Sequence, residues 1–446
     1  MTKLSLTNCQ EQALIAIQDW WESKEKHFLL SGAPGTGKTF LAEYAIKGLK
    51  GAVPLFTAPT NEAVRQLELA LSDDGVGIKT TYSALGLSLS TKSFKQYIYQ
   101  RALPEDFDDF NLLIVDEASF AGKNVGETNK ADLMDYVMTC GMRTIWMGDW
   151  AQLPPVNQKD GESPVFNEGF TGVELLEVKR HAGDILKFNM SLREIIKKTI
   201  RNLPSIPESI KTKPIKDSFN LSQEDFEMII SDRARILVWT NKATKYCPAP
   251  GVKEYNDYIR GRLFGEDLAK KAPVYPTDKI LFASPLFRFK DAEKLTKKGL
   301  ENEESELIAS VNTRAEVVKT EPVTILGIKS FKTEIALEGG KTVTCYIPTN
   351  EGQVSKNELE QIIKAKASKL TGREAGKAWE YFHKFRSVFA DIKYTYCITG
   401  HRAQGSTVEK VFVSVPNILQ NRDRKVAFKN LNVCCSRSQK ELVLFV

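Results

Sequence analysis

The sequence predicts an α/β protein made of two halves, each with a parallel sheet, and an insertion in the second half. Over the first 180 residues, short unbroken apolar runs alternate with helical patterns, which is typical of strands covered on both faces. The alternation begins again near Ile185 and returns in about the last fifty residues. Between about residues 272 and 389 it gives way to β-rich segments followed by long helices.

The first half is expected to be a doubly wound parallel sheet flanked by helices. Its apolar runs predict strands at residues 29–31, 54–58, 112–116 and 144–148. Apolar residues recur at helical spacing between them and predict helices at residues 10–21, 39–50 and 61–71. We assign residues 1–180 to this domain, with an insertion at about 86–109.

The second half is expected to be interrupted. Its own strands are predicted at residues 236–240, 396–399, 411–415 and 442–446. The interruption contains β-rich pieces, which predict a small antiparallel barrel, at residues 279–282, 322–328, 334–337 and 342–347. Long helices rich in lysine and aromatic residues are expected within residues 355–389. The predicted boundaries are 181–271 and 390–446 for the second α/β domain and 272–389 for the insertion.

Composition indicates a globular protein with reduced thiols. The chain has 446 residues, 42% of them hydrophobic, and no apolar run approaches the length of about 20 residues that spans a membrane. We therefore expect a cytoplasmic protein without membrane contact. Seven cysteines without a C-x-x-C pair suggest neither a disulfide framework nor a zinc site.

The charge is unevenly distributed along the chain. The net charge is +6, but residues 353–446 alone carry 17 Lys and Arg against 8 Asp and Glu. Such an excess suits a polyanion such as nucleic acid, although a solvated basic surface has the same composition.

A complete phosphate-binding loop occupies residues 32–39, which read GAPGTGKT. We expect backbone N–H groups of this loop to surround the phosphates of a nucleoside triphosphate. The residues of this cradle are Gly32, Ala33, Pro34, Gly35, Thr36 and Gly37. Lys38 is expected to place a positive charge at the β- and γ-phosphates, and the Thr39 hydroxyl to bind Mg²⁺. A glycine-rich turn without a ligand is the alternative, but the match is complete and lies between an apolar run and a helical pattern.

Two further elements fit nucleotide hydrolysis. Asp116 and Glu117 end an apolar strand, where Asp116 is expected to hold Mg²⁺ through water and Glu117 to orient and deprotonate the attacking water. Gln152 follows Gly148-Asp149 and precedes Leu-Pro-Pro-Val, so it can reach a γ-phosphate and report its presence. The alternatives are solvation of a strand end for the acidic pair and a proline-rich linker for the third element.

With these three elements in order, the chain resembles superfamily 1 helicases, most closely the Dda-like and RecD-like branch of subfamily 1B found in bacteriophages. The resemblance implies two RecA-like P-loop domains, a β-hairpin pin inserted in the first, and an SH3-like β-barrel with a helical tower inserted in the second. It implies an ATP-dependent DNA helicase that uses ATP and Mg²⁺, moves 5′ to 3′ on single-stranded DNA and unwinds forked duplex DNA. A monomer in the cytoplasm of a phage host, acting in replication or recombination with single-strand-binding or replication proteins, completes this expectation.

The resemblance also assigns nucleotide contacts. Gln10 stands where the family has a glutamine that reads the adenine edge, and Gly405 falls in a motif that reaches the nucleotide. Arg180, at the junction of the halves, and Arg437, near the C-terminus, match arginines that contact phosphate. Because they come from the junction and the second half, they are expected to reach the γ-phosphate only when the halves close over ATP.

DNA contacts are implied by three motifs. The residues concerned are Thr57, Pro59, Thr60, Asn61, Thr81, Tyr82, Thr399, His401 and Arg402. The chain has Tyr82 where the family commonly has His, Arg402 where it has Lys and Ser436 where it has Thr, and each substitute keeps the needed chemistry. In the insertion at 86–109, Tyr99 is the expected base-stacking aromatic of the pin; packing of the insertion onto its domain is the alternative role.

Two other functions remain open from the sequence. A DNA-stimulated translocase that displaces bound proteins without useful unwinding would carry the same motifs. A P-loop kinase or a switch protein would carry the phosphate loop, but its ATP turnover would not respond to single-stranded DNA.

Overall fold

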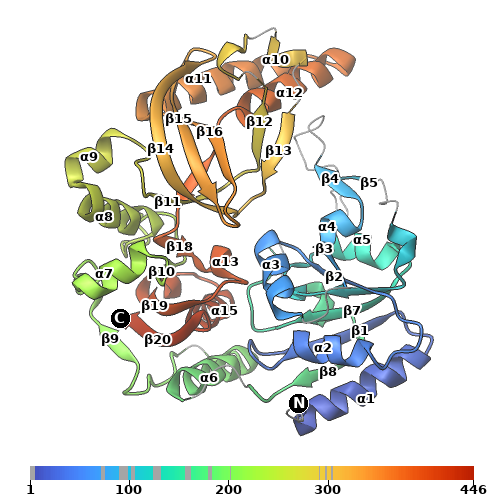
Figure 1. The fold of residues 1–446 in the computed structure, drawn as a ribbon. Coiled ribbons are helices and arrows are strands. Elements are labelled where there is room, and N and C mark those ends of the chain that lie inside the picture. Colours follow the sequence, from blue (N-terminus) through green and yellow to red (C-terminus); the bar gives the residue numbers. More distant parts are fainter. Residues whose placement is uncertain are drawn as a thin grey trace.

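In the computed structural model, the chain forms two α/β domains side by side, with an inserted antiparallel sheet and a pair of long helices above the second (Figure 1). The structure describes residues 6–71, 76–89, 99–101, 106–123, 132–155, 162–178, 183–200, 202–290, 292–296, 299–302 and 305–446.

The first domain is a six-stranded parallel sheet in the order β3-β2-β6-β7-β1-β8. Its strands are β1 (His27–Gly32), β2 (Pro54–Ala58), β3 (Gly77–Thr80), β6 (Leu112–Val115), β7 (Arg143–Gly148) and β8 (Thr171–Leu175). Its helices are α1 (Asn8–Glu22), α2 (Lys38–Ile46), α3 (Asn61–Ala70), α4 (Thr81–Ala84) and α5 (Leu133–Thr139). Phe28 and Leu30 pack in the core with α1 and α2, whereas Leu29 packs on the opposite face with α5, so apolar residues are buried on both sides of β1. The predicted doubly wound sheet is confirmed.

A hairpin rises from this domain at the expected insertion. The antiparallel strands β4 (Leu87–Leu89) and β5 (Tyr99–Arg101) pair with Leu89 opposite Tyr99. The backbone of Tyr99 therefore lies in the hairpin, while its side chain and residues 90–98 lie outside the described residues.

The second domain is a five-stranded parallel sheet in the order β18-β10-β19-β20-β9. Its strands are β9 (Lys211–Lys213), β10 (Ala234–Val238), β18 (Cys397–Thr399), β19 (Val408–Ser414) and β20 (Ser438–Phe445). Its helices are α6 (Asp184–Lys198), α7 (Gln223–Ile230), α8 (Val252–Phe264), α9 (Glu266–Lys271), α13 (Gly400–Ala403), α14 (Val415–Leu419) and α15 (Arg424–Cys435). Helix α6 follows the junction and packs against α15, so it belongs to the core of the second domain.

The insertion is an antiparallel sheet with the order β16-β15-β14-β11-β17, joined by a strand pair and two long helices. Its strands are β11 (Lys279–Phe282), β12 (Leu286–Phe289), β13 (Ser305–Ala309), β14 (Arg314–Ile325), β15 (Ile328–Leu337), β16 (Thr342–Pro348) and β17 (Ile392–Tyr394). Its helices are α10 (Gly299–Asn302), α11 (Asn350–Ala367) and α12 (Gly372–Ser387). Because β17 pairs with β11, the sheet of the insertion extends beyond the expected boundary at residue 389.

The stretch 322–328, expected as a single strand, is divided by a turn. Leu326 and Gly327 both have positive φ, 52° and 82°, and Ile325 pairs with Ile328 across them. This is the two-residue turn that matches the twist of a hairpin, and it separates β14 from β15.

The short 3₁₀ helices are η1 (Phe107–Asp109), η2 (Ala118–Phe120), η3 (Pro164–Phe166), η4 (Ile215–Asp217) and η5 (Ala292–Lys294). Within the part of the chain that the structure describes, none of the helices combines the length and apolar character needed to cross a bilayer.

Candidate active site

The phosphate loop joins β1 to the first turn of α2, as the sequence predicts. Gly35 and Gly37 both have a φ of 82°, a conformation in which side-chain-bearing residues are strained, so the two glycines allow the loop to turn inward. The ammonium of Lys38 donates hydrogen bonds to the carbonyl oxygens of Gly32 at 2.9 Å and Ala33 at 3.1 Å, which holds it over the loop.

Three carboxylates surround this ammonium. Burial lowers the pKa of Lys38, and the charges of Asp149, Asp116 and Glu117 oppose that shift because each favours the charged ammonium. They come from the ends of β6 and β7, neighbours in the sheet. The site therefore has carboxylates and a cation close enough to act on one another, and these are the kinds of groups that bind Mg²⁺ and phosphate.

Glu117 is held in an unusual conformation beside Asp116. Its φ of 52° and ψ of 46° are left-handed, and its backbone N–H donates to Asp116 Oδ1 at 2.8 Å. Burial, and then the charge of Asp116, raise the pKa of Glu117 to about 7. Burial also raises the pKa of Asp116. A carboxylate with a pKa near neutrality is suited to accept a proton from water.

Gln10, in α1, is hydrogen-bonded to the phosphate loop. Its Nε2 donates to the carbonyl oxygen of Thr36 at 3.1 Å, and its Oε1 accepts the backbone N–H of Thr7 as part of a capping box at the start of α1. The side chain is 2% exposed. The structure thus brings Gln10 to the predicted nucleotide site, and α1 fixes its position.

The loop after β7 extends from the phosphate site to the second domain. Asp149 is fully buried, and its Oδ1 accepts the backbone N–H of Ala151 at 2.9 Å and is ion-paired with Arg193 of α6. Gln152 Oε1 accepts a hydrogen bond from Gln404 Nε2 at 3.3 Å. Gln404 directly follows α13, whose His401 and Arg402 are predicted to contact DNA, so the predicted phosphate sensor is in direct contact with this part of the second domain.

Arg437 of the second domain also reaches the site. Its Nε donates to the Val433 carbonyl oxygen at 3.1 Å and its Nη2 to Ser436 Oγ at 3.0 Å, which fixes the guanidinium at the end of α15. It is close enough to Glu117 to favour the charged form of that carboxylate and so to oppose the rise in its pKa. A cation of the second domain therefore acts electrostatically on the candidate base of the first. Arg180 lies outside the described residues.

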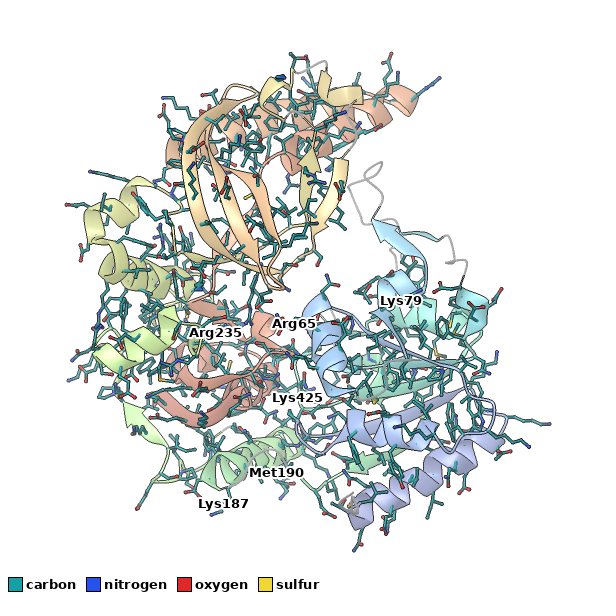
Figure 2. The ribbon with its side chains drawn as sticks, viewed as in Figure 1. Arg65, Lys79, Lys187, Met190, Arg235 and Lys425 are labelled. Atoms are coloured by element: carbon teal, nitrogen blue, oxygen red, sulfur yellow. The ribbon has the colours of Figure 1, made fainter. Side chains whose placement is uncertain are left out.

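Gly405 lies at the same interface, with a φ of 78°, and a Cβ at this position would lie 3.9 Å from the Cβ of Ala63 in α3. Lys425 and Lys429 of α15 reach across to Glu162 in the first domain, at 2.7 Å and 3.6 Å, and Figure 2 shows Lys425 between the two halves.

The predicted DNA-contacting residues differ in burial: most are at least partly exposed at the starts of helices, and two are fully buried. Pro59, Thr60 and Asn61 lie at the start of α3, and Thr399, His401 and Arg402 at the start of α13; Tyr82 is half-buried in α4. Thr57 and Thr81 differ from this group because both are 0% exposed. The Thr81 hydroxyl donates to that of Thr57 at 3.2 Å, and the Thr57 hydroxyl to the Ile114 carbonyl oxygen at 2.9 Å. The expectation that these two side chains contact DNA does not agree with this burial; they join β2, β6 and α4.

Two of the predicted DNA-contacting residues, one in α3 and one in α13, also contact the insertion. The Asn61 amide donates to Ser310 Oγ, and Arg402 Nη1 donates to Asn312 Oδ1 at 3.3 Å. Arg65, further along α3, forms an ion pair with Glu338 at 3.1 Å, and Figure 2 shows it on the side of α3 turned toward the other half. Burial lowers the pKa of the adjacent His401.

Arg193 was not identified from the sequence. It is buried in α6 beside Leu192 and one turn before Ile196, both of which belong to the core of the second domain. A charged residue within such an apolar stripe indicates a buried ion pair, and this is the signal that could have identified it. Its partner Asp149, however, is distant in the sequence and could not be assigned from spacing.

Comparisons with known proteins give one family model and two relatives. Residues 6–196 match the family model of an AAA domain. The chain is 23% identical to the ATP-dependent DNA helicase Dda of Enterobacteria phage T4, over 94% of both chains. It is also 23% identical to the uncharacterised protein R530 of Acanthamoeba polyphaga mimivirus, over 94% of this chain and 95% of the relative.

Two solved structures are similar at lower identity. One is Bacteroides Pif1 bound to ssDNA, with 14% identity over 100% of this chain and 93% of that chain and a TM-score of 0.48. The other describes two coordinating Pif1 helicases at forked dsDNA, with 15% identity over 99% and 92% and a TM-score of 0.48. Together, the phosphate loop and the AAA-domain match identify the first domain as nucleotide-binding.

Proposed function

Because the chain is a Dda-like helicase of superfamily 1B, we propose that it hydrolyses ATP to move 5′ to 3′ along single-stranded DNA and to separate a forked duplex. The observation that carries this proposal is that the second domain completes the nucleotide site: Gln404 binds Gln152 at 3.3 Å, and the charge of Arg437 acts on Glu117. A motor must couple ATP hydrolysis to the distance between its two domains, and a nucleotide site built from both domains provides this coupling. A P-loop kinase or a switch protein has no need to couple hydrolysis to movement along DNA. The similarity to the T4 helicase over 94% of both chains supports the same activity.

The residues of the first domain have distinct roles in this proposal. Lys38 holds the β- and γ-phosphates, and Gln10, on the loop at Thr36, contacts the base. Thr39 and Asp116 would hold Mg²⁺, which neutralises phosphate charge when bound. Glu117 orients a water molecule and accepts its proton, a role that the pKa of about 7 permits at neutral pH.

The second domain supplies the coupling. Arg437 stabilises the negative charge that develops on the phosphate, an effect typically worth about 10³- to 10⁵-fold in rate. Arg180 is proposed to act beside it. Gln152, joined to Gln404, reports the presence of the γ-phosphate to the second domain. Hydrolysis therefore occurs when the halves are closed, and it removes the contacts that keep them closed.

DNA is proposed to cross the top of both domains. Pro59, Thr60 and Asn61 hold it on the first domain, and Thr399, His401 and Arg402 on the second. Tyr82 stacks on a base, while Thr57 and Thr81 keep the supporting strands in place.

The hairpin supports a role in strand separation. Tyr99 is proposed as the ring that stacks on the base at the fork. Stacking of a base on an aromatic ring is worth about 1 to 3 kcal/mol, and a duplex step averages about 1.4 kcal/mol. One ring can thus offset about one opened base pair.

The biological setting is proposed from the viral relatives. The protein acts as a monomer in phage DNA replication or recombination, in the cytoplasm of the host cell. Single-strand-binding and replication proteins are its expected partners.

The decisive measurement is the ATPase rate with and without single-stranded DNA, together with strand release from forked duplexes with a 5′ or a 3′ tail. We expect strong stimulation by DNA, release only from the 5′-tailed fork, and loss of both in Lys38→Ala. ATP turnover that ignores DNA would exclude the motor. Stimulation without strand release would favour a protein-displacing translocase, and unimpaired release by Tyr99→Ala would exclude Tyr99 as the pin residue.

A further inference from the structure

The loop that follows β7 belongs to the first domain by sequence but is held by the second. Ala151 is fully buried in the core of the second domain, among residues of α6 and α15 that include Phe188, Leu192 and Leu431. A rigid movement of one domain relative to the other must therefore carry this loop with the second domain or pull it out of that core.

Polar side chains of the second domain bind the main chain of the loop. Lys429 Nζ donates to the Trp150 carbonyl oxygen at 2.7 Å, and Asn432 Nδ2 to that of Ala151 at 3.2 Å. Gln404 Nε2 adds a contact to the Leu153 carbonyl oxygen at 3.4 Å. Because they bind carbonyl groups, these contacts fix the path of the backbone as well as its side chains.

Arg193 joins the other end of the loop to α6. Its guanidinium is ion-paired with Asp149 and, at 3.2 Å, with Glu174 of β8, and its centre lies 4.7 Å from that of the Trp150 ring. Trp150 Nε1 donates to the same Glu174 carboxylate at 2.7 Å. Because Arg193 is only 6% exposed, its guanidinium is a buried, planar and multiply bonded contact between the domains.

Asp149 connects the cluster to the nucleotide site. Its charge acts on both Lys38 and Glu117. Among the described residues, its Oδ2 is buried and has no hydrogen-bond partner. One oxygen of this carboxylate is thus bound to the second domain by Arg193, and the group as a whole lies beside the residues that would hold and cleave the triphosphate.

We propose that Arg193 is a positioning residue that transmits the state of the nucleotide site through Asp149 to α6 and the second domain. The physical basis is a continuous set of contacts with two possible arrangements, depending on whether the negative charge of a nearby phosphate repels Asp149 and so weakens its ion pair with Arg193. Helix α6 packs along α15, which ends two residues before Arg437, so displacement of Arg193 would shift the segment that brings Arg437 to the site (Figure 1). This inference rests on the proposed helicase function.

The test is the ratio of strand-separation rate to ATP-hydrolysis rate on a 5′-tailed fork. Arg193→Gln removes the charge and the stacking plane, and we expect this ratio to fall about ten-fold, a size found for mutations along coupling networks. The affinity for a fluorescent ATP analogue should change less than about three-fold, because Arg193 does not touch the phosphate loop. The matched control is Arg262→Gln, which removes an arginine that lies over the Phe226 ring at 4.3 Å in the second domain, away from the interface.

Each result decides a separate question. A ratio unchanged in Arg193→Gln, or reduced equally in Arg262→Gln, overturns the positioning role. If Arg193→Gln does not melt cooperatively, Arg193→Lys is measured instead; it retains the charge but loses the planar contact, and an unchanged ratio there also overturns the role. Failure of the proposed function is distinguishable, because the wild-type protein itself would then show no DNA-stimulated hydrolysis or strand release.

Discussion

At the residue scale, Glu117 gives the reaction a pH dependence. Its pKa is raised to about 7 by burial and by the charge of Asp116, and a general base works only when deprotonated. We expect kcat/KM for ATP to rise with pH until about 7 and then to level off, with a loss of about ten-fold per pH unit on the acid side. A steady-state profile from pH 5.5 to 9 with saturating DNA measures it.

Glu117→Gln is the control for this profile. It is nearly isosteric and cannot accept a proton, so hydrolysis should fall by about 10² to 10⁴-fold and lose the rise near pH 7. A wild-type rate that stays level down to pH 5.5 would contradict the assignment of Glu117 as the base.

At the scale of the element, the hairpin turn between β14 and β15 depends on the backbone of Gly327. A Cβ would meet no atom within 4 Å there, as at Gly376 in α12, but only Gly327 has a positive φ. Gly327→Ala should therefore destabilise the insertion by about 1 kcal/mol through strain. Gly376→Ala should stabilise it by about 1 kcal/mol through helix propensity. Thermal melts that shift in the same direction for both variants would exclude this account.

Elements of this kind also show what the sequence could and could not predict. The central strands β1, β6 and β7 are unbroken apolar runs, and burial on both faces makes such runs recognisable. The strand β3 was missed because Ile78 is its only strongly apolar residue. Its four residues are all half-buried, so the strand needs no continuous apolar run. The turn at Leu326 was missed because leucine rarely adopts a positive φ, and the neighbouring residues Ile325 and Ile328 are apolar.

At the scale of the whole molecule, Lys429 makes the contact between the halves sensitive to pH. Burial lowers its pKa to about 8, although Glu162 in the other domain favours its charged form. Between about pH 8 and 10.5, the unfolded chain binds a proton at this lysine that the folded chain does not. Its contribution to the free energy of unfolding should therefore rise with pH in this window, by up to about 1 kcal/mol per pH unit.

The measurement is the difference in melting temperature between the wild-type protein and Lys429→Met at pH 7.5, 8.5 and 9.5. Wild type should gain on the variant as pH rises. Lys425→Met is the matched control because Lys425 binds the same Glu162. If the difference in melting temperature is independent of pH, or follows the same trend in the control, burial does not lower the pKa of Lys429.

The whole molecule also sets the limit on predicting the site. The phosphate loop, the acidic pair and Gln152 are local patterns, and the structure brings Lys38, Glu117, Gln152 and Arg437 together at the domain interface. The role of Arg193 depends on a contact between α6 and the end of β7, which spacing along the chain does not encode. The burial of Thr57 and Thr81 likewise arises from the packing of β2 against β6 and α4.

The contacts of the insertion with Asn61 and Arg402 affect how tightly the protein binds DNA. Ser310 and Asn312 lie two residues apart in the loop between β13 and β14. They bind Asn61 and Arg402, one polar side chain on each domain, which the proposed function assigns to a DNA strand. The loop that contains Ser310 and Asn312 therefore competes with DNA for these two side chains. A strand must displace this loop before it gains both contacts, so the observed affinity is the intrinsic affinity reduced by the fraction of molecules in which the loop has already released them.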